Sequence, residues 1–187
     1  DTRLLTPLPR RSDKTTLLFI GTMNYEPCID GMVFFCKEVL PQLRKLLPDI
    51  ELLIVGANPS AEVLALQKDD VIVTGRVDSV LPYYEKSAIS IVPLRAGGGT
   101  RLKVLEAMAL GRPVVSTTIG SEGIEAVDRK DLLIANEAKQ FVDKIFSLVN
   151  DKGLYDKISS NARELVVEKY DWDILTKKLE QVYGTPK

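Results

Sequence analysis

The chain has 187 residues, of which 45% are hydrophobic and 27% are charged, as expected for one globular domain with a substantial core. Its 25 Lys and Arg residues balance 26 Asp and Glu residues, so no excess of positive charge indicates a nucleic-acid partner. The sequence contains no histidine, which excludes a Ser-His-Asp or Cys-His mechanism and a histidine zinc site within this chain.

Two cysteines, Cys28 and Cys36, are too few for a disulfide framework and do not form a metal-ligand pattern. No stretch reaches the roughly 18 apolar residues of a membrane span, and no signal peptide opens the chain. These features predict a reduced, cytoplasmic setting.

Residues 1–15 contain Pro7 and Pro9 without hydrophobic periodicity, which predicts a linker or tail ahead of a domain that spans residues 16–187. Short apolar runs then alternate with segments of helical periodicity. Strands are predicted over residues 16–20, 51–56, 71–75, 88–94 and 113–117, with a weaker one over 131–135. Helices are predicted over residues 32–47, 61–67, 80–86 and 100–110, and three more over 138–150, 155–169 and 172–183. Pro41 falls inside the first of these helices and is expected to kink or split it.

The predicted strands are continuous apolar runs, a pattern typical of a parallel sheet that is covered on both faces. Strands that alternate with helices favour right-handed crossovers, so the fold class is α/β, a Rossmann-like doubly wound parallel sheet followed by C-terminal helices. Ligands of such sheets bind at the carboxyl ends of the strands, near the point where the strand order reverses.

Glycines stand at several of these strand ends. They occur in the pairs Gly21-Thr22 and Gly75-Arg76, in the run 97–99, and in the segment 120–123. A single glycine at a strand end usually makes a turn, but several on one edge of the sheet indicate a ligand.

The segment that begins with three glycines and continues Thr100, Arg101, Leu102, Lys103 has the composition of an anion site. Glycines allow positive φ and a close approach of backbone to ligand, and Thr100 is expected to cap the next helix. The free N–H groups of the first turn and the side chains of Arg101 and Lys103 would then face a phosphate. The alternative is a flexible loop with two solvated basic residues.

The helix that follows is apolar on nearly every side from Val104 onward, except at Glu106. A buried carboxylate is costly unless it has partners. Lys103, three residues earlier, could pair with it, or the carboxylate could accept hydrogen bonds from both hydroxyls of a ribose. The sequence leaves both interpretations open.

The stretch 97–117, GGGTRLKVLEAMALGRPVVST, resembles the donor-site signature of the group 1 (family four) retaining glycosyltransferases. Residues 19–27, 53–56, 73–77 and 119–124 continue the resemblance, which covers about residues 16–183. It implies a GT-B fold, in which two Rossmann-like domains face each other across a cleft, and it makes this chain the donor-binding half.

The resemblance also implies a role for each matching residue. Arg101 and Lys103 would stabilise the leaving diphosphate, and Glu106 would hold the ribose. The donor-binding set would be completed by Gly21 and Thr22 near the phosphates, Gly75, Arg76 and Val77 at the base, and Gly98, Gly99, Thr100 and Glu122 near the phosphates and the sugar.

One position departs from the family pattern. The paired-glutamate motif of the family places its first glutamate at position 98, where this chain has Gly98. That glutamate normally helps to hold the donor sugar, so backbone amides of the glycine loop or Glu122 are expected to replace it. The first loop also lacks the Arg and Lys pair that some relatives use to bind the diphosphate. Arg101 and Lys103 are therefore expected to be more important for diphosphate binding in this chain.

The implied partners are a nucleotide sugar and an amino-terminal, acceptor-binding domain, with the last helix and its Trp172 packing on that domain. The resemblance leaves room for a peripheral contact with the inner face of a membrane through that domain. No cofactor and no metal are expected, because no acidic cluster accompanies the phosphate loop. The donor base, the donor sugar and the acceptor are not indicated.

Two alternatives stay open: a GT-B-like sugar-nucleotide epimerase, and a non-catalytic Rossmann-like interaction domain. A nicotinamide dehydrogenase is disfavoured because no Gly-x-Gly-x-x-Gly follows the first strand.

Overall fold

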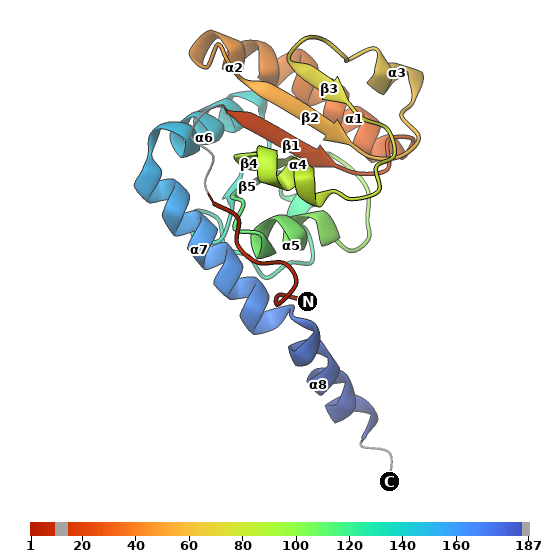
Figure 1. The fold of residues 1–187 in the computed structure, drawn as a ribbon, viewed down its shortest axis with the longest axis vertical. Helices are drawn as coiled ribbons and strands as arrows, with labels where there is room; N and C mark the ends of the chain where they lie inside the picture. The colour runs from red at the N-terminus through yellow and green to blue at the C-terminus, as the bar shows by residue number, and fades with distance from the viewer. Residues whose placement is uncertain (10–14, 185–187) are drawn as a thin grey trace.

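A computed structural model describes residues 1–9 and 15–184 of the chain (Figure 1). Its centre is one sheet of six parallel strands in the order β3-β2-β1-β4-β5-β6. The strands are β1 (Thr16–Ile20), β2 (Glu51–Val55), β3 (Val71–Val73), β4 (Ile89–Val92), β5 (Val114–Ser116) and β6 (Leu133–Ile134). All six predicted strands are therefore confirmed, and all except β1 are one to three residues shorter than predicted.

The register fixes β1 in the middle of the sheet. Leu18 of β1 pairs with Leu53 of β2 on one side and with Ser90 of β4 on the other. The strands of this central part are buried on both faces, as the continuous apolar runs predict. The doubly wound parallel α/β fold is therefore confirmed.

Helices cover both faces of the sheet. They are α1 (Glu26–Phe34), α2 (Leu40–Leu46), α3 (Ala61–Leu64), α4 (Leu81–Lys86), α5 (Leu102–Ala109), α6 (Ala138–Asn150), α7 (Lys152–Lys169) and α8 (Trp172–Tyr183). Helix α2 and the segment that joins it to α1 pack with α6, and the rings of Phe34 and Phe35 meet the ring of Phe141 edge-on. Helix α5 packs on β4, β5 and α7, while α8 extends away from the body of the domain (Figure 1).

The predicted helix over residues 32–47 begins earlier and is divided. It starts at Glu26, where Pro27 occupies a position that needs no intrahelical N–H bond. A π-helical turn, Phe35–Val39, then separates α1 from α2. Pro41 has no N–H, and its ring would clash with the carbonyl four residues earlier, so the helix widens just before it. The predicted split at Pro41 is confirmed.

Two further boundaries differ from the prediction. Helix α3 ends at Leu64, whereas the prediction continued to residue 67. Helix α7 begins at Lys152, before the predicted residue 155, because the carboxylate of Asp151 accepts a hydrogen bond from the N–H of Leu154 and caps the helix.

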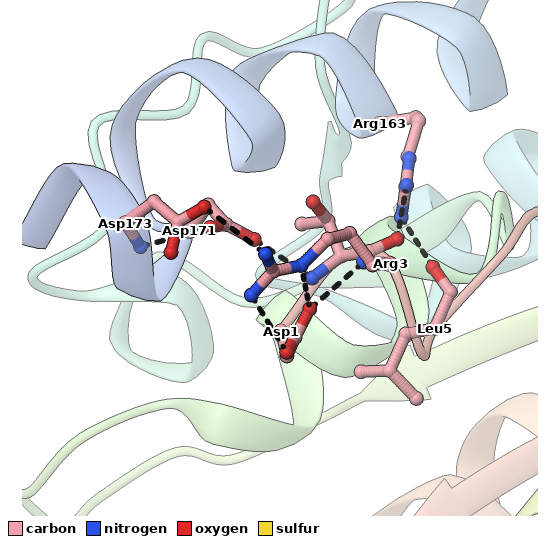
Figure 2. Close-up of polar contacts among 7 residues, drawn as sticks. Asp1, Arg3, Leu5, Arg163, Asp171 and Asp173 are labelled. Carbon is pink, nitrogen blue, oxygen red and sulfur yellow. Dashed lines mark hydrogen bonds and ion pairs between the residues drawn. The ribbon is translucent and has the colours of Figure 1, made fainter.

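The amino-terminal segment lies against α7, α8 and the end of α5 (Figure 2). The guanidinium of Arg163 donates to the carbonyls of Leu5, Ala109 (2.6 Å) and Thr2 (2.6 Å). The carboxylate of Asp171, which caps α8, accepts the N–H of Thr2 at 2.7 Å. One arginine thus joins the start of the chain to the C-terminal end of α5.

A second arginine continues this attachment. Arg112 is fully buried and donates to the carbonyl of Pro9 at 2.9 Å, while the N–H of Leu8 donates to the carbonyl of Leu110 at 3.0 Å. Residues 1–9 of the predicted tail are therefore packed on the domain, and residues 10–14 lie outside the described residues. Among the described helices, none has both the length and the apolar character needed to cross a membrane.

The attachment of the amino-terminal segment should depend on pH. The N–H groups of Thr2 and Asp173 donate to the carboxylate of Asp171 and hold its pKa below the ordinary value. A lowered folded-state pKa gives stability that is complete above the unfolded pKa of about 3.9 and is lost as the pH falls below it. We therefore expect Asp171→Ala to lower the Tm at pH 7, and the difference from wild type to shrink at pH 3.

Circular dichroism at a series of pH values measures this difference. Asp156 is exposed on α7 and makes a matched control, because Asp156→Ala should not reproduce the pH-dependent loss. A Tm difference for Asp171→Ala that is the same at pH 7 and pH 3 would contradict the account.

Candidate functional site

The strand order reverses at β1 and β4. Chain connections leave β1 toward β2 and β3 on one side, and leave β4 toward β5 and β6 on the other. In doubly wound sheets the loops after two such strands diverge, and ligands bind between them. The loop after β1 contains Gly21 and Thr22, and the loop after β4 contains the three glycines 97–99.

Three glycines bring the ends of β1, β2 and β3 together. A Cβ on Gly56 would lie only 1.6 Å from the carbonyl oxygen of Gly21, so no other residue fits there without moving the backbone. The N–H of Gly56 in turn donates to the carbonyl of Gly75 at 3.2 Å. The predicted loops at Gly21 and Gly75 thus lie on the same edge of the sheet. In the second of these loops, Arg76 is exposed and Val77 packs against the core.

Lys103 reaches the end of β1 from the first turn of α5. Its Nζ atom would lie 3.0 Å from a Cβ on Gly21, and it stands 4.5 Å from the ring centroid of Phe19 and 3.9 Å from Sγ of Cys28. Burial lowers the pKa of the Lys103 ammonium from its ordinary value. No ion pair joins it to Glu106 or to another carboxylate in the described part of the chain. The interpretation of a buried Lys103–Glu106 pair is therefore wrong.

The glycine loop is open on one side and packed on the other. Gly97 and Gly99 have φ of +99° and +97°, as the expectation of positive φ requires. A Cβ on Gly97 would lie 2.8 Å from the hydroxyl oxygen of Tyr25, whereas nothing lies within 4 Å of a Cβ on Gly98 or Gly99. The open side of the loop therefore lies at Gly98 and Gly99.

The predicted cap of α5 by Thr100 is wrong. The helix begins at Leu102, so the cap position falls on Arg101, and no side chain caps it. The carbonyl of Arg101 accepts the N–H of Val104 at 2.9 Å and so starts the helix one residue later than expected. Thr100 remains part of the loop and lines the pocket described below.

Arg101 is buried, with only 5% of its surface exposed. Its Nη1 atom donates to the carbonyl of Gly98 at 3.0 Å, and its Nη2 atom donates to the carbonyls of Gly97 and Ile119, both at 2.8 Å. The carboxylate of Glu122 lies 3.8 Å from Nη2. These contacts exclude the alternative of two solvated basic residues, and they direct the guanidinium at loop carbonyls, away from the expected open position beside the phosphates.

Glu106 lies on the wall of a pocket of about 830 Å³. Its carboxyl is half-buried, and burial raises the pKa of this group. The polar residues of the pocket wall include Gly99, Thr100, Arg101 and Glu122, which come from the loops after β4 and β5. The apolar residues of the wall are Leu5, Leu102, Leu105, Ala109, Ile124, Val166, Tyr170, Trp172 and Leu175. Glu106 therefore faces the same space as the glycine loop.

Among the described residues, no three His, Cys, Asp or Glu side chains come together in an arrangement that could hold a metal ion. The cationic side chains of the loops after β3 and β4 and of the first turn of α5 are Arg76, Arg95, Arg101 and Lys103. Arg95 is paired with Asp30, and Arg101 is bound to loop carbonyls.

Residues 14–151, which include the whole sheet and the glycine loop, match the protein family described as Glycosyl transferases group 1. The chain belongs to this family.

Individual relatives agree with this assignment. An uncharacterized 44.6 kDa protein in the cps region of Klebsiella pneumoniae is 30% identical over 164 residues, which make up 83% of this chain and 42% of that protein. This chain thus spans less than half the length of that relative.

Solved structures of glycosyltransferases share the fold. The C-terminal domain of LpcC, a glycosyl transferase group 1 family protein from Francisella tularensis, superposes with a TM-score of 0.72 at 20% identity and covers 92% of this chain and 98% of that domain. HepE from Anabaena, solved in complex with UDP-glucose, has a TM-score of 0.70 at 14% identity over 92% of this chain and 50% of that protein. The Rossmann-like sheet is thus the fold of GT-B glycosyltransferases.

The sequence did not identify the residues that surround the site from α1 and β1. Phe19 and Cys28 hold Lys103, and Tyr25 packs on the glycine loop. These residues stand about 75 positions from their partners, and no spacing rule links them. One signal was present in the sequence, because proline is common in the first turn of a helix. Pro27 could therefore have predicted a helix that begins beside the first loop, with Tyr25 and Cys28 at its start.

The difference between Gly97 and Gly98 can be tested directly. Gly97→Ala places a Cβ at positive φ and close to the Tyr25 hydroxyl, so we expect a loss of about 1–3 kcal/mol in the free energy of unfolding. Gly98→Ala meets open space outside the left-handed region, so we expect a change within about 1 kcal/mol. Urea unfolding followed by fluorescence measures both, and equal losses would show that the loop has a different conformation.

Proposed function

We propose that this chain is the donor-binding half of a retaining glycosyltransferase that moves a sugar from a nucleoside-diphosphate sugar to an acceptor. The observation that carries the proposal is the position of the Lys103 ammonium at the end of β1, near Gly21, without a neutralising carboxylate in the described residues. Glu106, three residues later on the same helix, lines the pocket that the glycine loop also lines. A diphosphate bound at the loop with its ribose near Glu106 would use both groups.

The diphosphate is the leaving group in this reaction, and negative charge grows on it as the glycosidic bond breaks. Lys103 and the N–H groups of Gly98, Gly99 and Thr100 supply donors that are already in place before the reaction begins. Such preorganised donors stabilise a developing charge without solvent rearrangement, which is often the largest contribution to catalysis. We propose that these groups take the part that a metal ion plays in other phosphate sites, and that the enzyme needs neither a metal nor another cofactor.

The ribose and the base are assigned to neighbouring elements. The Glu106 carboxylate accepts hydrogen bonds from the ribose hydroxyls, and because burial raises its pKa, donor binding weakens as the pH falls through that raised value. The loop of Gly75, Arg76 and Val77, which touches the first loop through Gly56, lies where the base would extend. Thr22 follows Gly21 in the first loop and faces the phosphates in this proposal.

The sugar is assigned to the region between Gly98 and Glu122. The backbone at Gly98 leaves open space where the family motif has its first glutamate. The Glu122 side chain is 71% exposed, and its carboxylate lies 3.8 Å from the guanidinium that holds the Gly98 carbonyl. It is therefore close enough to this space to replace the missing carboxylate.

The chain spans less than half of the Klebsiella relative, which supports the proposal that a second domain provides the acceptor site. HepE, which was solved with UDP-glucose, supports a nucleotide sugar as the donor. We further propose that α8, with Trp172 60% exposed, packs on that second domain.

Isothermal titration calorimetry with UDP, GDP and ADP and their sugar derivatives tests the donor site. One nucleoside diphosphate should bind the wild-type chain. Lys103→Ala should weaken it by roughly 10- to 100-fold, because a charge-assisted hydrogen bond contributes about 1.5–3 kcal/mol. Glu106→Ala should weaken diphosphate and nucleoside alike, since both carry the ribose. Lys45→Ala, an exposed lysine of α2, is the matched control and should bind like wild type. Wild-type affinity in both site variants would defeat the assignment.

Product analysis of the full-length parent tests the chemistry. NMR of the product should show that the anomeric configuration of the donor is retained after transfer to the acceptor. An inverted product would contradict the retaining mechanism, an epimerised nucleotide sugar without transfer would indicate an epimerase, and the absence of any nucleotide binding would indicate an interaction domain.

A further inference from the structure

Arg101 stands directly after the glycine loop, yet its side chain points back into the protein. Its Nη1 atom contacts the Gly98 carbonyl, and its Nη2 atom contacts the carbonyls of Gly97 and Ile119. The side chain is 4% exposed, whereas its only ion-pair partner among the described residues, Glu122, is 71% exposed. The guanidinium is therefore satisfied mainly by backbone carbonyls from two different loops.

These contacts leave no two-pronged grip for a phosphate. A guanidinium holds a phosphate through two parallel N–H groups, either those of Nη1 and Nη2 or those of Nε and Nη2. Both pairs include a hydrogen of Nη2. Both hydrogens of Nη2 are engaged, one by Gly97 and one by Ile119. The Nε atom, the remaining prong on that side, is buried without a hydrogen-bond partner. Arg101 would have to release the loop before it could bind a diphosphate in this way.

The same contacts fix the direction of two N–H groups. In a trans peptide the C=O and the following N–H point in opposite directions. The Gly97 carbonyl shares its peptide plane with the N–H of Gly98, and the Gly98 carbonyl shares its plane with the N–H of Gly99. Since both carbonyls point to Arg101, the two N–H groups point away from it. The loop is open at these positions, because a Cβ on Gly98 or Gly99 would meet nothing within 4 Å.

We propose that Arg101 is a positioning residue that does not touch the donor. It locks two peptide planes so that the N–H groups of Gly98 and Gly99 face the diphosphate, and its bond to Ile119 couples this loop to the one that carries Glu122. Three consecutive glycines have no side chains to hold their conformation. Tyr25 packs beside Gly97, and Arg101 bonds the carbonyls of Gly97 and Gly98 directly. This inference rests on the proposed function for the identity of the ligand. The three hydrogen bonds from Arg101 to the carbonyls of Gly97, Gly98 and Ile119, called the lock below, exist in the unliganded chain.

The lock can be measured without any ligand. Amide hydrogen exchange of the free chain should show that Arg101→Lys, which keeps the charge but lacks the planar fork, accelerates exchange in residues 97–102 and 119–123. Lys45→Ala, an exposed residue of α2, is the control and should leave exchange in these segments unchanged. Wild-type exchange in Arg101→Lys would overturn the lock, whatever the chain binds.

The consequence for binding is measured with the nucleoside diphosphate that binds wild type and with the corresponding nucleoside, at a temperature where each variant is folded. Arg101→Lys should lose about tenfold or more in affinity for the diphosphate, because two directed amides are lost, but little for the nucleoside. A variant that was merely less stable would keep the ratio of the two affinities. Full diphosphate affinity in Arg101→Lys would overturn the inference.

A crystal structure of the wild-type chain with the same diphosphate decides the matter without a substitution. The guanidinium should keep its three carbonyl contacts while the amides of Gly98 and Gly99 approach the phosphates, and a guanidinium bound to a phosphate would overturn the inference. If no nucleotide binds wild type but the exchange result holds, the proposed function fails and the lock stands.

Discussion

The parallel alignment of β1 with β2 on one side and β4 on the other is the constraint on which the candidate site depends. Because the strands run in the same direction, the loops after them meet at one edge of the sheet, although they are far apart in the sequence. The contact between Gly21 and Gly56 then sets how closely the first two loops approach, since a single Cβ at Gly56 would lie 1.6 Å from the Gly21 carbonyl. A change in this packing would alter the distance between Lys103 and the end of β1. The arrangement of the site would then be lost although its polar residues were unchanged.

Two cations that stand two positions apart have different environments. Arg101 precedes α5, so its side chain folds back on the loop and meets carbonyl dipoles, which use most of its hydrogen-bonding capacity. Lys103 lies within the first turn and is turned toward β1, where an aromatic face and a thiol surround its ammonium without neutralising it. The first cation orders the backbone, and the second keeps its charge available for an anion. The ring of Phe19 suits this second task, because a ring face attracts a cation but cannot take its proton.

Helix α5 is held at both ends. Arg101 fixes the loop at its N-terminal end, and Arg163 binds the carbonyl of Ala109 at its C-terminal end. Arg163 also binds the carbonyls of Thr2 and Leu5 (Figure 2). The helix that carries Lys103 and Glu106 is therefore joined to the amino-terminal segment and, through that segment, to the first turn of α8.

The sequence by itself determined the order of strands and helices, the parallel character of the sheet, the break at Pro41 and the position of the glycine loops at the carboxyl edge. These features follow from periodicity and from the backbone limits of glycine and proline, which act within one element. Only the tertiary structure decided that Arg101 is buried against Ile119, that Lys103 meets Phe19 and not Glu106, and that Thr100 does not cap α5. A pattern in one segment shows which side of it is buried, but the partner on that side belongs to another part of the chain, and only the folded packing brings the two together.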